Sequence, residues 1–177
     1  MEAQLPNQEI VLVLVVLSTD AWRIQEPPDW EAAQRFAQAA VEMAEQLSNP
    51  VDHSQALGAY ATVLEGRSQL REHLTVAQQR LALCREPKFR DVRETLDALR
   101  GAGAALMYVG ESAQAITYLQ EAENLAARVQ VIDQQANAVG LQVQCLYRLD
   151  RWDEVIAMEE RWRDLERRYS RERVGET

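Results

Sequence analysis

The segment Gly103–Ala126, GAALMYVGESAQAITYLQEAENLA, determines how this chain folds. Two apolar helical stretches flank a Val-Gly turn, and small residues stand at positions where two helices would cross. Gly103 and Ala115 suit a close approach of two backbones, because neither has a bulky side chain. Leu119 and Ala122 would fill the gap to a neighbouring helix. The segment therefore predicts an antiparallel helix pair.

Breakers at regular intervals divide the whole chain into comparable segments. Asn49-Pro50 has the pattern of an N-cap followed by proline at the first helical position. Apolar residues within the segments recur at three- and four-residue spacings, which is one stripe of an α-helix. We expect helices at about 8–25, 29–47, 50–64, 69–85, 90–109, 112–129, 132–149 and from 152 to about 171. Only the boundary at Val129–Val131 has no breaker.

Helices of this kind need one another. Each has a single apolar stripe and would be unstable alone, whereas antiparallel neighbours joined by short turns bury their stripes together. We expect one all-α domain over residues 1–177, made of about four antiparallel helix pairs at roughly 8–47, 50–86, 89–129 and 131–171.

The Gly103–Ala126 segment resembles a tetratricopeptide repeat (TPR), and fainter copies begin near Ala32, Leu70 and Val155. From Ala32 to Leu70 to Ala115 to Val155 the steps are 38, 45 and 40 residues, against about 34 in the usual repeat. The chain is thus similar to the long-helix variety found in sensor regions of bacterial signalling ATPases and transcription regulators. This resemblance covers nearly the whole chain and implies a right-handed α-solenoid, an α-α superhelix.

Charge and hydropathy exclude several classes of protein. The chain of 177 residues has a formal net charge of −9, whereas a nucleic-acid binder normally presents a basic face. The apolar run Ile10–Leu17 is far shorter than the ~20 residues that a membrane-spanning helix needs. No basic residue precedes the run, unlike in a signal peptide. We expect a cytoplasmic protein that binds neither nucleic acid nor membrane.

No pattern in the sequence indicates catalysis. His53 and His73 are the only histidines, and neither has a metal-ligand partner four residues away. Cys84 and Cys145 lie singly within apolar helical patterns and are expected to be small buried residues. The Gly101–Gly103 segment follows no strand and does not continue as a phosphate-binding loop. We therefore expect no catalytic residue, no metal and no cofactor.

The TPR resemblance implies a binding surface, because the first helices of successive repeats line the concave face in that family. The side chains that this geometry selects are Asp97, Arg100, Met107, Tyr108, Asn137, Gln144, Tyr147 and Arg148. Amides can pair with an extended peptide backbone, while tyrosine and arginine are typical hot-spot residues. Ordinary solvated polar positions are the alternative interpretation. The basic clamp of some family members is not reproduced, since the equivalent positions hold Gln55, Arg100 and Gly140.

The two ends of the chain are unusual for a helical stack. Ile10–Leu17 is apolar all round, and its β-branched residues also leave a strand open. Either the run belongs to a longer solenoid or it forms a self-association surface. At the other end, Trp152, Trp162 and Tyr169 are expected to be partly exposed, since no helix follows them.

Two functions fit these observations. The first is a non-catalytic scaffold that binds a protein or peptide partner. The alternative is a regulatory sensor segment of a larger bacterial signalling or transcription-regulating protein, which binds a small effector or peptide and shifts its conformation.

Overall fold

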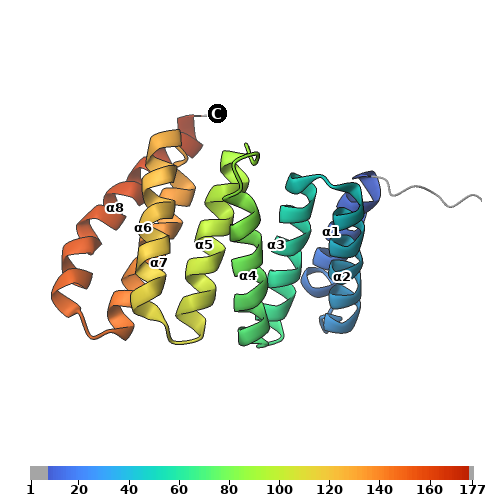
Figure 1. Cartoon of the computed structure of the whole chain (residues 1–177). Helices are drawn as coiled ribbons and strands as arrows, with labels where there is room; N and C mark the ends of the chain where they lie inside the picture. The colour runs from blue at the N-terminus through green and yellow to red at the C-terminus, as the bar shows by residue number, and fades with distance from the viewer. Residues whose placement is uncertain (1–7, 176–177) are drawn as a thin grey trace, which may run out of the picture. The chain divides into compact units, whose positions relative to one another are not determined.

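The computed structural model describes residues 8–175, and within that range the regular structure consists of α-helices alone (Figure 1). The helices are α1 Gln8–Arg23, α2 Trp30–Leu47, α3 Pro50–Gly66, α4 Leu70–Cys84, α5 Val92–Tyr108, α6 Ser112–Val129, α7 Ile132–Arg148 and α8 Trp152–Gly175. The all-α prediction is confirmed, and the run at Ile10–Leu17 is helical.

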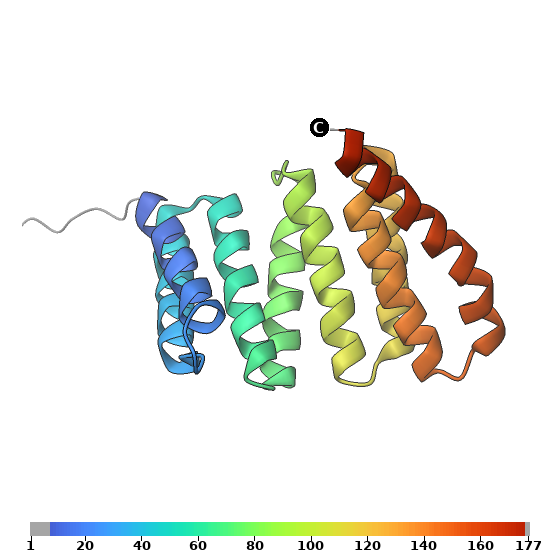
Figure 2. The same cartoon turned by 180° about the vertical axis from the view of Figure 1, so that it is seen from behind.

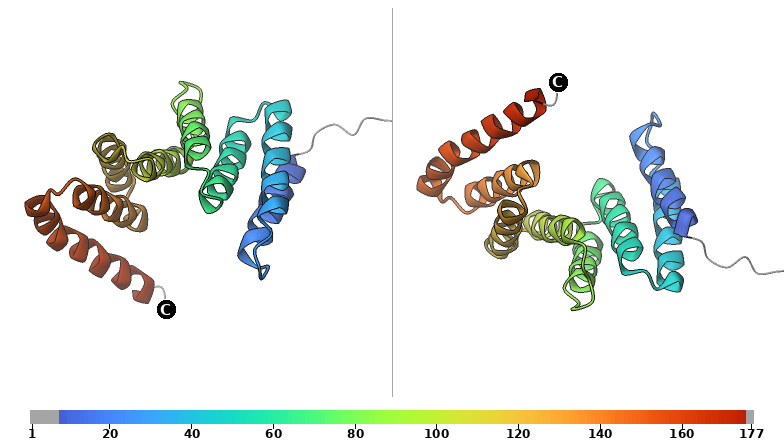
Figure 3. Two further views of the ribbon diagram at one scale, coloured as in Figure 1. Left: turned by 90° about the horizontal axis from the view of Figure 1, so that it is seen from below. Right: turned by 90° about the horizontal axis from the view of Figure 1, so that it is seen from above.

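The chain divides into two compact units, one ending at Ala98 and the other beginning at Leu99. In the first unit, α1 packs on α2 and α3, α2 on α3, and α3 on α4. In the second, α6 packs on α7 and α7 on α8. Within each unit, helices that are consecutive in sequence lie side by side and run in alternating directions (Figures 2 and 3). That all of these helices form one domain remains a prediction.

Local chemistry sets the helix ends. The Asp29 carboxylate accepts a hydrogen bond from Ala32 N at 2.9 Å, and the Asn49 side chain accepts one from Val51 N at 3.0 Å. Gly110 ends α5 with φ of +92°, which glycine adopts without strain. Gln130 ends α6 in the left-handed region, with φ of 59°. Because the residue is neither glycine nor asparagine, the usual choices at such a position, the sequence does not mark this helix end.

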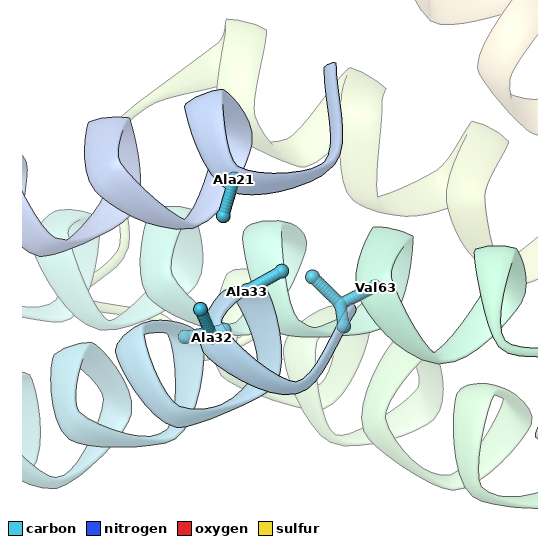
Figure 4. Close-up of a cluster of buried hydrophobic side chains, with 5 residues drawn as sticks. Ala21, Ala32, Ala33 and Val63 are labelled. Carbon is cyan, nitrogen blue, oxygen red and sulfur yellow. The ribbon is translucent and has the colours of Figure 1, made fainter. Parts of the chain in front are cut away.

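Small residues let the first three helices approach closely. Figure 4 shows Ala21 of α1, Ala32 and Ala33 of α2 and Val63 of α3 in one buried cluster. The stacked rings of Trp22 and Trp30, with centroids 5.9 Å apart and planes 7° apart, lie beside this cluster.

The buried stripe of α2 consists of alanines. Ala33, Ala37, Ala40 and Ala44 have at most 1% of their surface exposed, whereas the larger Phe36 is half-buried. Because α2 contacts α1 on one side and α3 on the other, the residues between those contacts must be the smallest. Periodicity alone could not distinguish this arrangement from a single buried face.

The crossing of α5 and α6 is the one that the sequence indicated. A Cβ atom on Gly103 would lie 2.7 Å from both Cγ and Cδ2 of Leu119 and 3.5 Å from the Ala115 carbonyl oxygen. Ala115 and Leu119 are fully buried. A Cβ atom on Gly101, two residues earlier, would have no neighbouring atom within 4 Å. Close packing therefore requires the second glycine and not the first.

An ionic cluster centred on the buried Arg80 connects α3, α4 and the start of α5 in the first unit, with Glu94 and Asp97 partly exposed. The Arg80 guanidinium donates to Glu94 Oε2 and to Asp97 Oδ2, both at 2.8 Å, and its Nε donates to Ser54 Oγ at 3.1 Å. Ser54 in turn donates to Glu94 Oε2 at 2.8 Å. Burial alone would lower the pKa of Arg80, but Asp97 and Glu94 outweigh it and raise that pKa above its usual value. The cation is therefore held permanently charged among its partners.

Gly58 makes room for this cluster. A Cβ atom there would lie 2.8 Å from Arg80 Nη1 and 2.9 Å from Cζ. The group that Gly58 admits is therefore a side chain of α4.

His73 makes the stability of the first unit depend on pH. Its ring is 3% exposed, and burial lowers its pKa more than the charge of Glu65 raises it. The unfolded chain therefore takes up this proton first, near pH 6.5. The stabilisation is fully present above that pH and is lost as pH falls toward the lower folded-state pKa. We expect the urea midpoint to fall between about pH 7 and pH 5, and to fall less steeply in His73→Gln. If the urea midpoint falls equally steeply with pH in the wild type and in His73→Gln, His73 is not the source of the pH dependence.

Candidate binding groove between α7 and α8

The second unit contains a polar hollow of about 630 Å³. Residues of α7 form one wall, residues of α8 the other, and Arg100 of α5 contributes a cation. Its lining includes Arg100, Asp133, Gln134, Asn137, Gly140, Gln144, Trp162, Glu166 and Tyr169. The hollow is thus rich in amides, with charges of both signs at its margin.

An apolar hollow of about 390 Å³ adjoins the polar one. Its lining is Gly140, Val143, Gln144, Val155, Ile156, Glu159 and Trp162. Because Gly140, Gln144 and Trp162 line both hollows, the two form one groove, which we call the α7–α8 groove.

Helical spacing explains how α7 supplies its wall. Asn137, Leu141 and Gln144 recur at intervals of four and three residues, so their side chains share one face of the helix. Gly140 lies on the same face, and a Cβ atom there would lie 3.7 Å from the indole nitrogen of Trp162. The absence of a side chain at position 140 thus leaves space beside the Trp162 ring, which is 37% exposed.

Interactions at two points hold α8 against its neighbours. Leu165 is 3% exposed and anchors the helix in the core. Arg161 forms an ion pair with Glu123 of α6, and Gln142 of α7 donates to the other Glu123 oxygen at 2.9 Å. Glu123 is itself 3% exposed, so it joins three helices from a buried position.

One acceptor in the groove lacks a donor. Gln134 Oε1 is buried and accepts no hydrogen bond from the described residues. A buried polar atom without a partner costs roughly 1–3 kcal/mol. A ligand N–H that reached this amide would remove that cost.

The structure brings together three of the eight side chains that the TPR resemblance selected, namely Arg100, Asn137 and Gln144. Tyr147 is 58% exposed, lies outside both hollows and packs edge-on against Trp152 at 4.9 Å. Tyr108 is half-buried and lines neither hollow. Whether any of these residues binds a partner remains a prediction.

The other three selected side chains have structural contacts. Met107 has no exposed surface, so the expectation that it faces a groove is wrong. The Arg148 guanidinium donates to the Met107 carbonyl at 3.0 Å. Asp97 pairs with Arg80 in the first unit. A position in the first helix of a repeat does not by itself distinguish a core contact from an exposed one.

Sequence reasoning missed the contribution of α8 to the groove. In a repeat stack, the second helix of a pair normally packs against the following pair, so Val155 was assigned to the repeat and Trp162 only to a partly exposed end, and neither was assigned to a binding surface. No helix follows α8 among the described residues, and these side chains are left beside the groove. The expected exposure of Trp162 and Tyr169 was the available signal.

The described residues contain no group of three His, Cys, Asp or Glu side chains that could hold a metal ion. Burial raises the pKa of the Cys145 thiol to about 11 and also raises that of Cys84, so neither supplies a thiolate nucleophile near neutral pH. Within the same range, none of the helices has the length and apolar character to cross a bilayer.

No family model and no curated protein matches the sequence. Solved structures do match it. Aspartyl phosphate phosphatase F from Bacillus subtilis is 13% identical with a TM-score of 0.79, over 96% of this chain and 43% of that one. A Rap protein complexed with Competence and Sporulation Factor is 14% identical with a TM-score of 0.77, over 93% and 44%. A kinesin light chain TPR-like repeat protein from Podosopora anserina is 16% identical with a TM-score of 0.59, over 93% and 88%.

These likenesses confirm a TPR-like fold of helical hairpins. The chain spans less than half the length of the phosphatase and of the Rap protein. At identities of 13–16%, the similarity extends to the fold and not to an activity.

Proposed function

We propose that this chain is a non-catalytic scaffold that binds a peptide segment of a partner in the α7–α8 groove. The observation that carries the proposal is the pair of adjoining hollows, one polar and one apolar, with the exposed ring of Trp162 lining both. Concave sites of this kind, mostly apolar with a few placed polar groups, are typical of ligand sites. A protein of similar fold has been seen complexed with Competence and Sporulation Factor.

The lining suggests how a peptide would bind. An apolar side chain would enter the hollow beside Val155 and Ile156. The Asn137 and Gln144 amides would pair with the peptide backbone, since each has both donor and acceptor atoms. Trp162 would contact both parts, and tryptophan is among the residues most enriched at binding hot spots.

The charges favour a basic peptide. Asp133, Glu159 and Glu166 line the groove, whereas Arg100 is the one cation among its described lining residues, and Glu159 also pairs with Arg163. The whole chain also has a net charge of −9. An apolar residue next to lysine or arginine is therefore the best complement to this lining.

The test is a fluorescence-polarisation screen of short synthetic peptides with leucine or isoleucine beside lysine, against matched peptides with glutamate in place of lysine. We expect the basic set to bind and Trp162→Ala to weaken binding by about tenfold or more. Trp152→Ala is the matched control, because Trp152 is exposed on the same helix but lines neither hollow. Equal binding by the two variants, or no peptide bound at all, would remove the proposal.

A regulatory sensor is the second candidate, and the complex of the Rap protein with Competence and Sporulation Factor favours it. A sensor must change conformation when its ligand binds, because a ligand shifts an equilibrium only by its differential affinity for two states. Hydrogen exchange with and without the best peptide distinguishes the two candidates. Protection limited to α7 and α8 indicates a scaffold, and protection that spreads to α6 indicates a sensor.

A further inference from the structure

One face of α1 is apolar and uncovered by the described residues. Leu12, Val13, Val16 and Leu17 are 59%, 54%, 49% and 40% exposed, and Ile24, directly after the helix, is 70% exposed. Monomeric proteins seldom expose a continuous apolar patch of this kind unless it has a function. In Figure 2, α1 (blue) lies in front of α2, at the outside of its unit.

The opposite face of α1 is firmly packed. Val11 is 2% exposed and lies in a cluster with Ala40, Ala44 and Ala56. The Ser18 hydroxyl is also buried and donates to the Ala33 carbonyl at 2.9 Å. Because these contacts fix the rotation of α1 about its axis, the helix cannot turn its exposed face inward.

The exposed face has the spacing of a helix–helix seam. Its central line, at intervals of four, three, four and three residues, is Glu9, Val13, Val16, Asp20 and Arg23. Alternating spacings of three and four residues are those by which two helices pack along their length. Leu12 and Leu17 flank the seam on either side and widen its apolar centre.

The charges on this seam distinguish its possible partners. Glu9 and Arg23 each lie seven residues from Val16, one toward each end of the helix. If a second α1 ran parallel, like charges would face each other at both ends. In an antiparallel pair centred on Val16, Glu9 of each copy meets Arg23 of the other, while Asp20 of each copy lies beside Val13 of the other. A twofold axis requires such self-complementarity of one surface.

We infer that a second copy of this chain covers α1, with the two helices antiparallel about a twofold axis near Val16. The exposed apolar side chains amount to roughly 500 Å² per copy, below the about 800 Å² per partner of a standard stable interface. The dimer is therefore a weak one, with dissociation in the micromolar range. It does not depend on the proposed peptide groove, because α1 and the groove belong to different units.

Light scattering on the whole chain tests the dimer. The mass should rise from that of one chain to that of two between about 1 and 100 µM. Val16→Glu, which places two carboxylates at the axis, should remain monomeric and keep its helical circular dichroism. Val92→Glu is the matched control, because Val92 is 43% exposed against 49% for Val16 but lies on α5, and this variant should still dimerise. A wild-type chain that stays monomeric over this range overturns the inference.

Cross-linking tests the antiparallel geometry. The native thiols Cys84 and Cys145 are buried, so an added surface cysteine reports on its own position. Val16→Cys should form a disulfide-linked dimer under mild oxidation. Ile24→Cys should not, because eight residues from the axis place the two copies about 24 Å apart. Linkage through both positions would indicate a parallel pair and would overturn the arrangement, and linkage through neither would overturn the dimer.

Discussion

Replacement of Arg80 by methionine is expected to lower the free energy of unfolding of the first unit by about 3–5 kcal/mol. Methionine keeps much of the length of the side chain but removes the charge. Glu94 and Asp97 would then lie close together without their shared cation, and the Ser54 hydroxyl would lose the donor from Arg80 Nε. The loss of one partner from a buried ion cluster costs far more than the cluster contributes when intact.

Urea denaturation followed by circular dichroism measures this loss. Arg71→Met is the matched control, because Arg71 is exposed on the same helix and its replacement should change stability by less than about 0.5 kcal/mol. The triple variant Arg80→Met, Glu94→Gln, Asp97→Asn should recover part of the loss, since it also removes the uncompensated charges. If Arg80→Met alone is as stable as Arg71→Met, the ionic cluster around Arg80 does not stabilise the first unit.

Replacement of Gly103 by leucine is expected to cost about 3 kcal/mol in the second unit, at the upper end of the usual range for overpacking. The first carbon of the new side chain would already lie 2.7 Å from two carbons of Leu119, which is fully buried and cannot withdraw into solvent. Either α5 and α6 separate, or Leu119 leaves its preferred rotamer. Both responses reduce packing in the centre of the hairpin.

Gly101→Leu is the matched control for this second result. The Cβ atom of a residue at position 101 meets no atom within 4 Å, and leucine favours helix over glycine by up to about 1 kcal/mol. The thermal midpoint of this variant should therefore equal or exceed that of the wild type. If the thermal midpoint of Gly103→Leu equals that of Gly101→Leu, the crossing of α5 and α6 tolerates a side chain at position 103.

Much of the fold could be predicted because turn chemistry and periodicity are local. Asn49-Pro50 and Gly110 marked helix ends from their immediate neighbours, and Gly103 with Ala115 marked a crossing. The end of α6 at Gln130 could not be placed so firmly, because the segment Val129–Val131 contains neither the glycine nor the proline that commonly marks a helix end. The alanine stripe of α2 depends on two flanking helices, which no local pattern contains.

The site was less predictable for a related reason. Asn137 and Gln144 were found because the TPR resemblance assigns that face of the first helix to the groove. Met107 occupies an equivalent helix but is buried, since exposure depends on what packs beside it. The contribution of Val155 and Ile156 depends on α8 having no neighbour on that side among the described residues. The exposure of these side chains depends on how the helices pack together, which a single stretch of sequence does not contain.

The two cysteines have a use that follows from their placement. Cys84 belongs to the first unit and Cys145 to the second, and both are inaccessible with raised pKa values. A thiol reagent can reach either sulfur only after the surrounding helices open. The protein thus carries one natural reporter of local opening in each half, and mass spectrometry can read the two independently without any label being introduced.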